Sequence, residues 1–210
     1  MKIDFLSLRV PRLSETVSFY RNHLDLPILT VGQEYAVFRA GSTVLMLEQV
    51  EDPEEKPFYH FAFDIPQNRL PQAEAWMCER VDLLKHEGKT RVKFKDWNAT
   101  SIYFHDPNGN IVELIARHNL KNDSKESFSG SSILRVSEIG WPCLMGFPDR
   151  DFKLPIWKEM EGFKAFGSET GLILVVDAGR PWLPTDRPAE AHPATLVLSD
   201  ENGSREYFRR

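Results

Sequence analysis

The pattern of hydrophobic and polar residues predicts the same order of elements twice in the first part of the chain. Residues 3–10 alternate with a period of two, which predicts a strand with one buried face. Apolar residues then recur at helical spacing after Ser14, a favourable N-cap, and Asp25-Leu26-Pro27 ends this helix. Two strands are predicted to follow, at 35–39 and 43–49.

A second unit repeats this order. Residues 58–65 form the predicted strand, and Pro71 opens a helix that ends at Gly88. One βαβββ unit cannot bury both faces of its sheet, so we expect the two units to pair and enclose a cup in an α+β fold. The apolar face of this helix is Ala73, Trp76, Met77, Val81 and Leu84, and the strands after it are predicted near 90–95, 101–105 and 111–116.

The remainder of the chain resembles a partial third unit. Residues 119–132 are small and polar, as in a linker between domain 1–118 and region 133–210. We expect this C-terminal region to be a non-catalytic layer that covers the first domain or forms a homodimer. Its predicted elements are a strand at 133–141, a short helix near 155–161, strands at 163–167, 171–177 and 194–199, and a proline-rich loop at 178–193.

Composition narrows the classes of partner. The formal net charge of −5 and the pI near 5.7 argue against nucleic acid as the main partner. No apolar run approaches the roughly 18 residues that a membrane span needs. Cys78 and Cys143 lie far apart and lack the spacing of metal ligands. We therefore expect a cytoplasmic protein with reduced thiols.

Glu113 is out of place in an apolar strand. Asp106-Pro107-Asn108-Gly109 is typical of a turn between two strands, and alternation puts Glu113 on one face with Ile111 and Ile115. A buried carboxylate is costly unless it is paired, hydrogen-bonded or bound to a metal. The partner of Glu113 therefore decides much of the function.

Two further polar side chains occupy apolar faces. His60 shares its face with Phe58 and Ala62, and Glu48 shares its face with Val44 and Met46. Histidine and carboxylate side chains that reach inward from separate strands are the ligands of a divalent-metal site. The alternatives are a hydrogen-bonded core histidine and a carboxylate at a solvated strand end.

Three motifs resemble the vicinal oxygen chelate superfamily. They are Leu8 to Tyr20, His60-Phe61-Ala62-Phe63, and Phe104 to Leu114, which is the most specific. This superfamily includes glyoxalase I, extradiol ring-cleavage dioxygenases, and bleomycin- and fosfomycin-resistance proteins. The resemblance covers residues 1–118 and implies a metal cup of paired βαβββ units.

Carried over by position, the resemblance implies an incomplete ligand set. His60 and Glu113 match two ligand positions, but Phe5 stands where the family often has a histidine. Met46 stands where glyoxalase-like members have a carboxylate, and Glu48, one inward step further along, is a possible third ligand.

The resemblance also implies the class of reaction. Tyr103 matches the active-site tyrosine of extradiol dioxygenases, although Met46 and Phe94 lie where their catalytic histidines would be. We expect an enzyme that uses Fe, Mn, Ni or Zn on a small oxygen-rich or aromatic substrate, with ring cleavage preferred over glyoxalase-like isomerisation. The alternatives are a metal-free, drug-sequestering protein and a remnant with a collapsed cup. The residues expected to line the cup are Phe5, Phe38, Met46 and Phe58.

Overall fold

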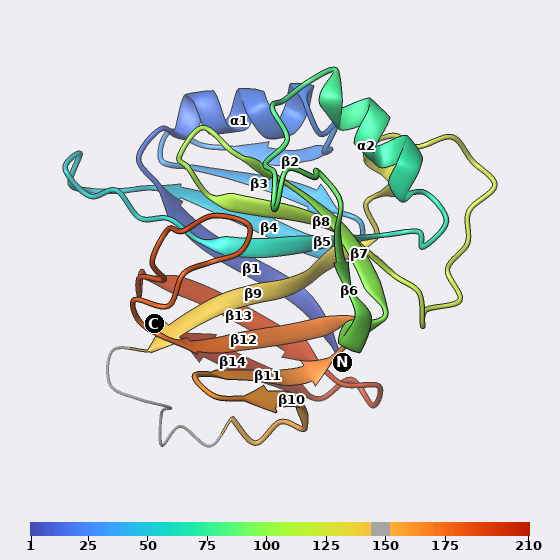
Figure 1. Ribbon diagram of the computed structural model, residues 1–210. Coiled ribbons are helices and arrows are strands. Elements are labelled where there is room, and N and C mark those ends of the chain that lie inside the picture. Colours follow the sequence, from blue (N-terminus) through green and yellow to red (C-terminus); the bar gives the residue numbers. More distant parts are fainter. Residues whose placement is uncertain (144–151) are drawn as a thin grey trace.

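The computed structural model describes residues 1–143 and 152–210, which form two β-sheets and two α-helices (Figure 1). One sheet contains β1 (Lys2–Val10), β2 (Ile28–Val31), β3 (Tyr35–Ala40), β4 (Thr43–Gln49), β13 (Ala194–Ser199) and β14 (Arg205–Arg209). The other contains β5 (His60–Ile65), β6 (Val92–Phe94), β7 (Ala99–His105), β8 (Ile111–Arg117), β9 (Arg135–Cys143), β10 (Ile156–Met160), β11 (Phe163–Ser168) and β12 (Gly171–Asp177). The helices are α1 (Leu13–Asn22) and α2 (Leu70–Cys78), which lie at the same end of the molecule in Figure 1.

The predicted α+β fold of βαβββ units is confirmed. In the first unit β1 and β4 are parallel neighbours, and in the second β5 and β8 are parallel neighbours. The C-terminal region follows the same plan, because β9 lies parallel to β12 and β11 and β10 continue outward. Each unit thus contributes four strands to a curved sheet.

The pairing of the units differs from the expected one. The first two units do not join edge to edge: the free side of β1 pairs with β13, and the free side of β5 pairs with β9. Both β1 and β5 are inner strands with apolar residues, so each needs a partner on both sides. The C-terminal region supplies both partners, and the second and third units together form the eight-stranded sheet.

Two local predictions are also wrong. Residues 155–161 form the strand β10 instead of a helix, because Ile156 to Met160 pair antiparallel with β11 at the sheet edge. Ser14 is not the N-cap, since α1 begins at Leu13 after Arg12. The strand β14, which pairs with β13, was not predicted.

The hydrophobic core lies between the two sheets. Leu6 and Leu8 of β1 face Phe61 and Phe63 of β5 within one continuous apolar cluster. Because side chains alternate along a strand, His60 and Ala62 point to the opposite face of the eight-stranded sheet. That face is therefore the inside of the cup. No helix in the described ranges 1–143 and 152–210 is long and apolar enough to cross a membrane.

The Asp106–Gly109 turn fastens the second unit to the first. The Tyr20 hydroxyl on α1 donates a hydrogen bond to the buried Asp106 carboxylate at 3.0 Å. The backbone N–H groups of Asn108 and Asn110 donate to the same side chain at 2.8 and 3.0 Å. Burial raises the pKa of Asp106, and these hydrogen bonds oppose that shift.

Candidate metal and substrate site

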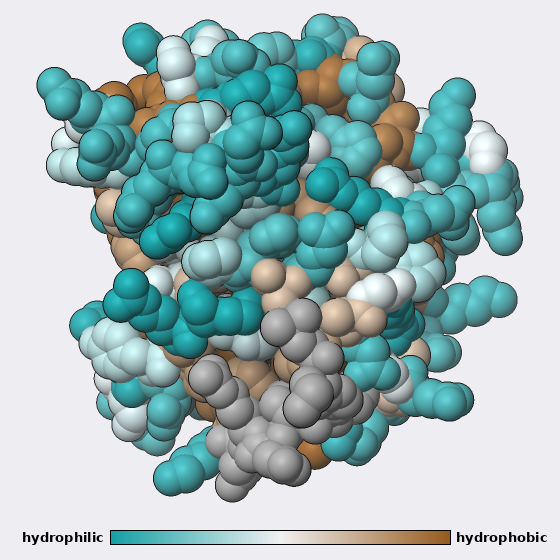
Figure 2. Space-filling view, turned by 90° about the vertical axis from the view of Figure 1, so that its left-hand side faces the viewer, coloured by the Kyte–Doolittle hydropathy of each residue, from teal (hydrophilic) through white to brown (hydrophobic). Residues whose placement is uncertain are grey.

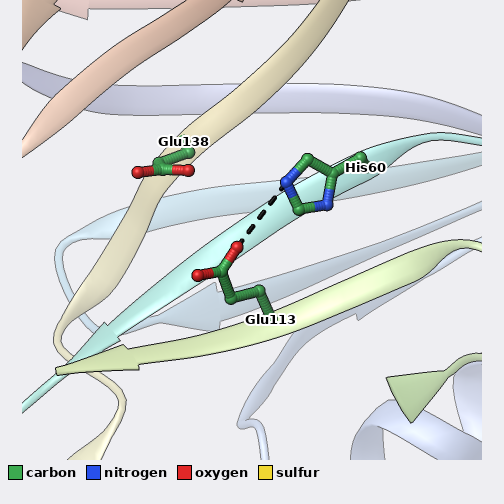
Figure 3. Close-up of side chains that lie close together, drawn as sticks. All are labelled: His60, Glu113 and Glu138. Carbon is green, nitrogen blue, oxygen red and sulfur yellow. Dashed lines mark ion pairs between the residues drawn. The ribbon is translucent and has the colours of Figure 1, made fainter. Parts of the chain in front are cut away.

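Three buried side chains converge inside the cup: His60 on β5, Glu113 on β8 and Glu138 on β9 (Figure 3). One ligand atom from each lies within 4.8 Å of the others. The strand register explains this, because Ala62 pairs with Glu113 on one side and with Glu138 on the other. A small side chain at Ala62 leaves the two carboxylates facing each other across β5.

His60 is held in the form that binds metals. Its Nδ1 lies 3.1 Å from the Ile111 carbonyl oxygen, so Nδ1–H donates there and Nε2 keeps its lone pair. Nε2 points toward Glu113, whose Oε2 is 3.6 Å away. Burial lowers the pKa of His60 and so keeps the ring neutral. A neutral imidazole with its other nitrogen bound to a carbonyl is the usual ligand geometry.

The two carboxylates destabilise each other in their negative forms. Burial, and then the nearby charge of Glu138, raise the pKa of Glu113 from 4.5 to about 8, although Arg117 and the Tyr103 hydroxyl oppose the shift. Arg117 also contacts Glu138 directly. A divalent cation would relieve the repulsion, and one imidazole with two carboxylates is a donor set that suits such an ion. The residues present therefore fit a metal site.

A cavity of about 280 Å³ opens beside this group. Tyr103 lies in it as the direct cross-strand neighbour of Glu113 and is itself buried. Burial, and then the charge of Glu113, raise the pKa of the Tyr103 phenol, so it stays protonated at neutral pH. Arg180 supplies a positive charge to the lining. The apolar lining consists of Phe94, Trp97, Ile115, Met160, Phe163, Leu174, Pro181, Trp182 and Leu183.

The loop at 178–193 covers part of the cup. Trp182 from this loop packs against His60, with ring centroids 4.8 Å apart. Gly140 makes room for it, because a Cβ there would lie 2.6 Å from the indole ring. Arg187 fixes the same loop by lying over Phe58 at 3.4 Å from the ring centroid. The face of the molecule turned to the viewer in Figure 2 is mostly hydrophilic, with hydrophobic atoms visible in separate patches.

The structure brings together some of the predicted site residues. His60, Glu113 and Tyr103 lie in one site, as the sequence predicts. Glu48 lies on β4 in the other sheet, where it accepts a hydrogen bond from Ser7, and it does not reach His60. Glu138 takes the place proposed for Glu48 in a set of one histidine and two glutamates.

Three of the four residues expected to line the cup lie elsewhere. Phe5 and Met46 are half-buried on the six-stranded sheet, and Phe38 is in the core against Tyr20, with centroids 5.9 Å apart. Phe58 belongs to the apolar cluster around the cavity. The reason is the changed pairing, since the cup that holds His60 is completed by the third unit.

Glu138, Arg117 and Trp182 were not predicted as site residues. Glu138 carries the same signal as Glu113, a carboxylate within a strand of apolar residues. Regular alternation along this strand puts Ser137 and Ile139 on one face and Val136 and Glu138 on the other. The register between β5 and β9 skips Ser137, so that Val136 and Ile139 both face the core and Glu138 faces the cup. A bulge of this kind cannot be read from a strand that is apolar on both faces.

The comparisons with known proteins agree with this fold. Residues 2–114, more than half of the chain, match the family model described as the Glyoxalase/Bleomycin resistance protein/Dioxygenase superfamily. Metallothiol transferase FosB from Staphylococcus saprophyticus is 32% identical over 118 residues, 53% of this chain and 74% of that protein. FosB from Shouchella clausii is 28% identical over 117 residues, 53% of this chain and 77% of that protein.

The structural comparison extends beyond the family model. A proposed dioxygenase from Bacillus subtilis has a TM-score of 0.63 at 14% identity and covers 97% of this chain and 72% of its own. Its fold therefore includes the C-terminal region. With the family model matched over both N-terminal units, this chain belongs to the glyoxalase/bleomycin resistance protein/dioxygenase superfamily.

Proposed function

We propose that this protein binds a divalent metal ion through His60, Glu113 and Glu138 and acts on a small substrate in the adjoining cavity. The observation that carries the proposal is the approach of three buried ligand atoms to within 4.8 Å of one another. The name of the FosB relatives, metallothiol transferase, supports a metal. Two carboxylates and one imidazole favour Mn²⁺ or Fe²⁺ among the expected ions Fe, Mn, Ni and Zn. Once bound, the metal would supply a Lewis acid for neighbouring substrate oxygens.

The lining of the cavity favours an aromatic substrate with adjacent oxygens. Trp97, Phe163 and Trp182 give flat apolar walls. Arg180 is the sole cation among the lining residues within 1–143 and 152–210, which favours at most one negative group on the substrate. Tyr103, which is protonated at neutral pH, would donate a hydrogen bond to a substrate oxygen. These features favour ring-cleavage chemistry over glyoxalase-like isomerisation.

A metal-free binding protein is the second candidate. The contact between His60 and Glu113 and the contact between Arg117 and Glu138 give each of these groups a partner without any ion. Trp182 against His60 would then serve as a stacking surface for a bound aromatic molecule. This protein would sequester its ligand and leave it unchanged.

Metal titration separates the two candidates. Protein freed of metal by a chelator is titrated with Mn²⁺ and Fe²⁺ in a calorimeter, under anaerobic conditions for iron. We expect one ion per chain, and markedly weaker but measurable binding in Glu113→Gln and Glu138→Gln. Glu48→Gln is the matched control and should bind as the wild type does. If the folded wild type binds none of Mn²⁺, Fe²⁺, Ni²⁺ or Zn²⁺, the enzyme proposal is refuted.

A further inference from the structure

Arg117 is completely buried at the end of β8. Within the described ranges, its Nε and Nη1 atoms have no hydrogen-bond partner, while Nη2 contacts Glu138. Removing a guanidinium from water is energetically costly unless its partners compensate. An arginine placed here with two donors unused is therefore not explained by stability alone.

Three buried carboxylates surround this guanidinium. Burial raises the pKa of Asp64 and of Glu113, and the charge of Arg117 opposes both shifts, but its direct contact is with Glu138. Asp64 has its own cation, Arg135, at 3.3 Å. The contact of Arg117 is thus directed at the one carboxylate that the third unit brings into the cup.

The two residues that pair with Glu138 in the sheet offer it no polar side chain. Its register partners are Ala62 on β5 and Leu172 on β12, and neither side chain can hold a carboxylate in place. The preceding Ser137 is skipped in the pairing with β5, which interrupts the regular backbone just before Glu138. Arg117, by contrast, contacts this carboxylate directly and can orient it.

We infer that Arg117 is a positioning residue that holds the Glu138 carboxylate inside the cup and so makes Glu138 the third metal ligand. The inference rests on the proposed metal site. A carboxylate has two oxygens, so one can accept from Arg117 while the other faces His60 and Glu113. Arg117 belongs to the second unit and Glu138 to the third, so this contact also links the halves of the cup.

The test is a double-mutant cycle on Mn²⁺ affinity. Arg117→Met should weaken Mn²⁺ binding by about 10- to 100-fold, as expected for removal of a residue that orients a ligand. The double variant Arg117→Met/Glu138→Gln should bind no more weakly than Glu138→Gln alone, because Arg117 acts through Glu138. Arg135→Met is the matched control, since it removes the neighbouring arginine that pairs with Asp64, and it should leave the affinity unchanged.

A spectroscopic measurement excludes a merely structural role. The electron paramagnetic resonance spectrum of bound Mn²⁺ should change in the same way in Arg117→Met and Glu138→Gln and stay unchanged in Arg135→Met. If Arg117→Met does not fold, Arg117→Lys takes its place, and it should bind Mn²⁺ more weakly than the wild type because a single ammonium orients a carboxylate less well.

The outcomes separate this inference from the proposed function. If the wild type binds Mn²⁺ and the Arg117 variants bind it equally or more tightly, the positioning role is refuted and the metal site stands. Additive losses in the double variant also refute it. If neither the wild type nor any folded variant binds Mn²⁺, Fe²⁺, Ni²⁺ or Zn²⁺, both proposals fail together.

Discussion

Replacing Glu113 with glutamine should stabilise the metal-free protein at neutral pH, although it removes a proposed metal ligand. Burial and the charge of Glu138 raise the pKa of Glu113 from 4.5 to about 8 in the folded protein. In the unfolded chain the group ionises near its ordinary pKa. The folded state therefore binds a proton more tightly, and its stability must fall as the pH rises through this window.

The size of the effect follows from the shift. Between pH 4.5 and about 8 the metal-free wild type loses about 1.4 kcal/mol of stability for each pH unit, or about 3 kcal/mol by pH 7. Glutamine resembles the protonated carboxyl in shape and does not ionise, so Glu113→Gln avoids this loss. Below pH 4.5 the wild type and Glu113→Gln should have similar free energies of unfolding. Above pH 8 the difference between their free energies of unfolding should no longer change with pH.

Urea unfolding followed by circular dichroism, with a chelator present, measures this difference at a series of pH values. Glu48→Gln, the same substitution on β4 outside the site, controls for the chemistry of the change. Saturating Mn²⁺ should reduce the advantage of Glu113→Gln, because an ion at 100 times its Kd stabilises only the protein that binds it, by about 2.7 kcal/mol. A variant that is less stable than the wild type at pH 7, or a difference that does not vary with pH, would refute the reasoning.

Three further substitutions test other parts of the structure. Trp182→Ala should lower affinity for an aromatic probe such as catechol and leave Mn²⁺ affinity intact, because Trp182 packs on His60 without being a ligand; calorimetry of both titrations checks this. Phe5→His should leave Mn²⁺ affinity unchanged, since Phe5 lies on the other sheet, and tighter binding would contradict that placement. Tyr20→Phe should lower the free energy of unfolding by about 1 to 3 kcal/mol in urea, because the buried Asp106 loses a donor, and an unchanged value would contradict this.

Local patterns in the sequence predicted most of the second unit. The turn at Asp106–Gly109, the strand with Glu113 and the strand with His60 are all found where alternation puts them. Tyr103 could be assigned to the same face as Glu113, because the two residues are cross-strand neighbours in a hairpin with a short turn. These predictions depend on contacts between residues that are near in the sequence.

The failures involve contacts between distant segments. Glu48 and Glu113 occupy similar positions in two similar units. No local pattern in the sequence indicates which strand of the C-terminal region pairs with which of these units. The pairing of β9 with β5 decides it, and the bulge at Ser137 decides that Glu138 faces the cup. Trp182 comes from a proline-rich loop whose course over His60 depends on the whole cup.

The sequence by itself determined the βαβββ units, the superfamily motifs and two of the three converging side chains proposed as metal ligands. The spacing of hydrophobic residues and the residue types at turns specify these features, and both signals extend over only a few residues. Only the tertiary structure decided that the third unit, expected to be non-catalytic, brings Glu138 to His60 and Glu113. An inner strand can form its backbone hydrogen bonds with any apolar strand that has a free edge. The choice between the available partner strands therefore depends on how the side chains of the complete chain pack.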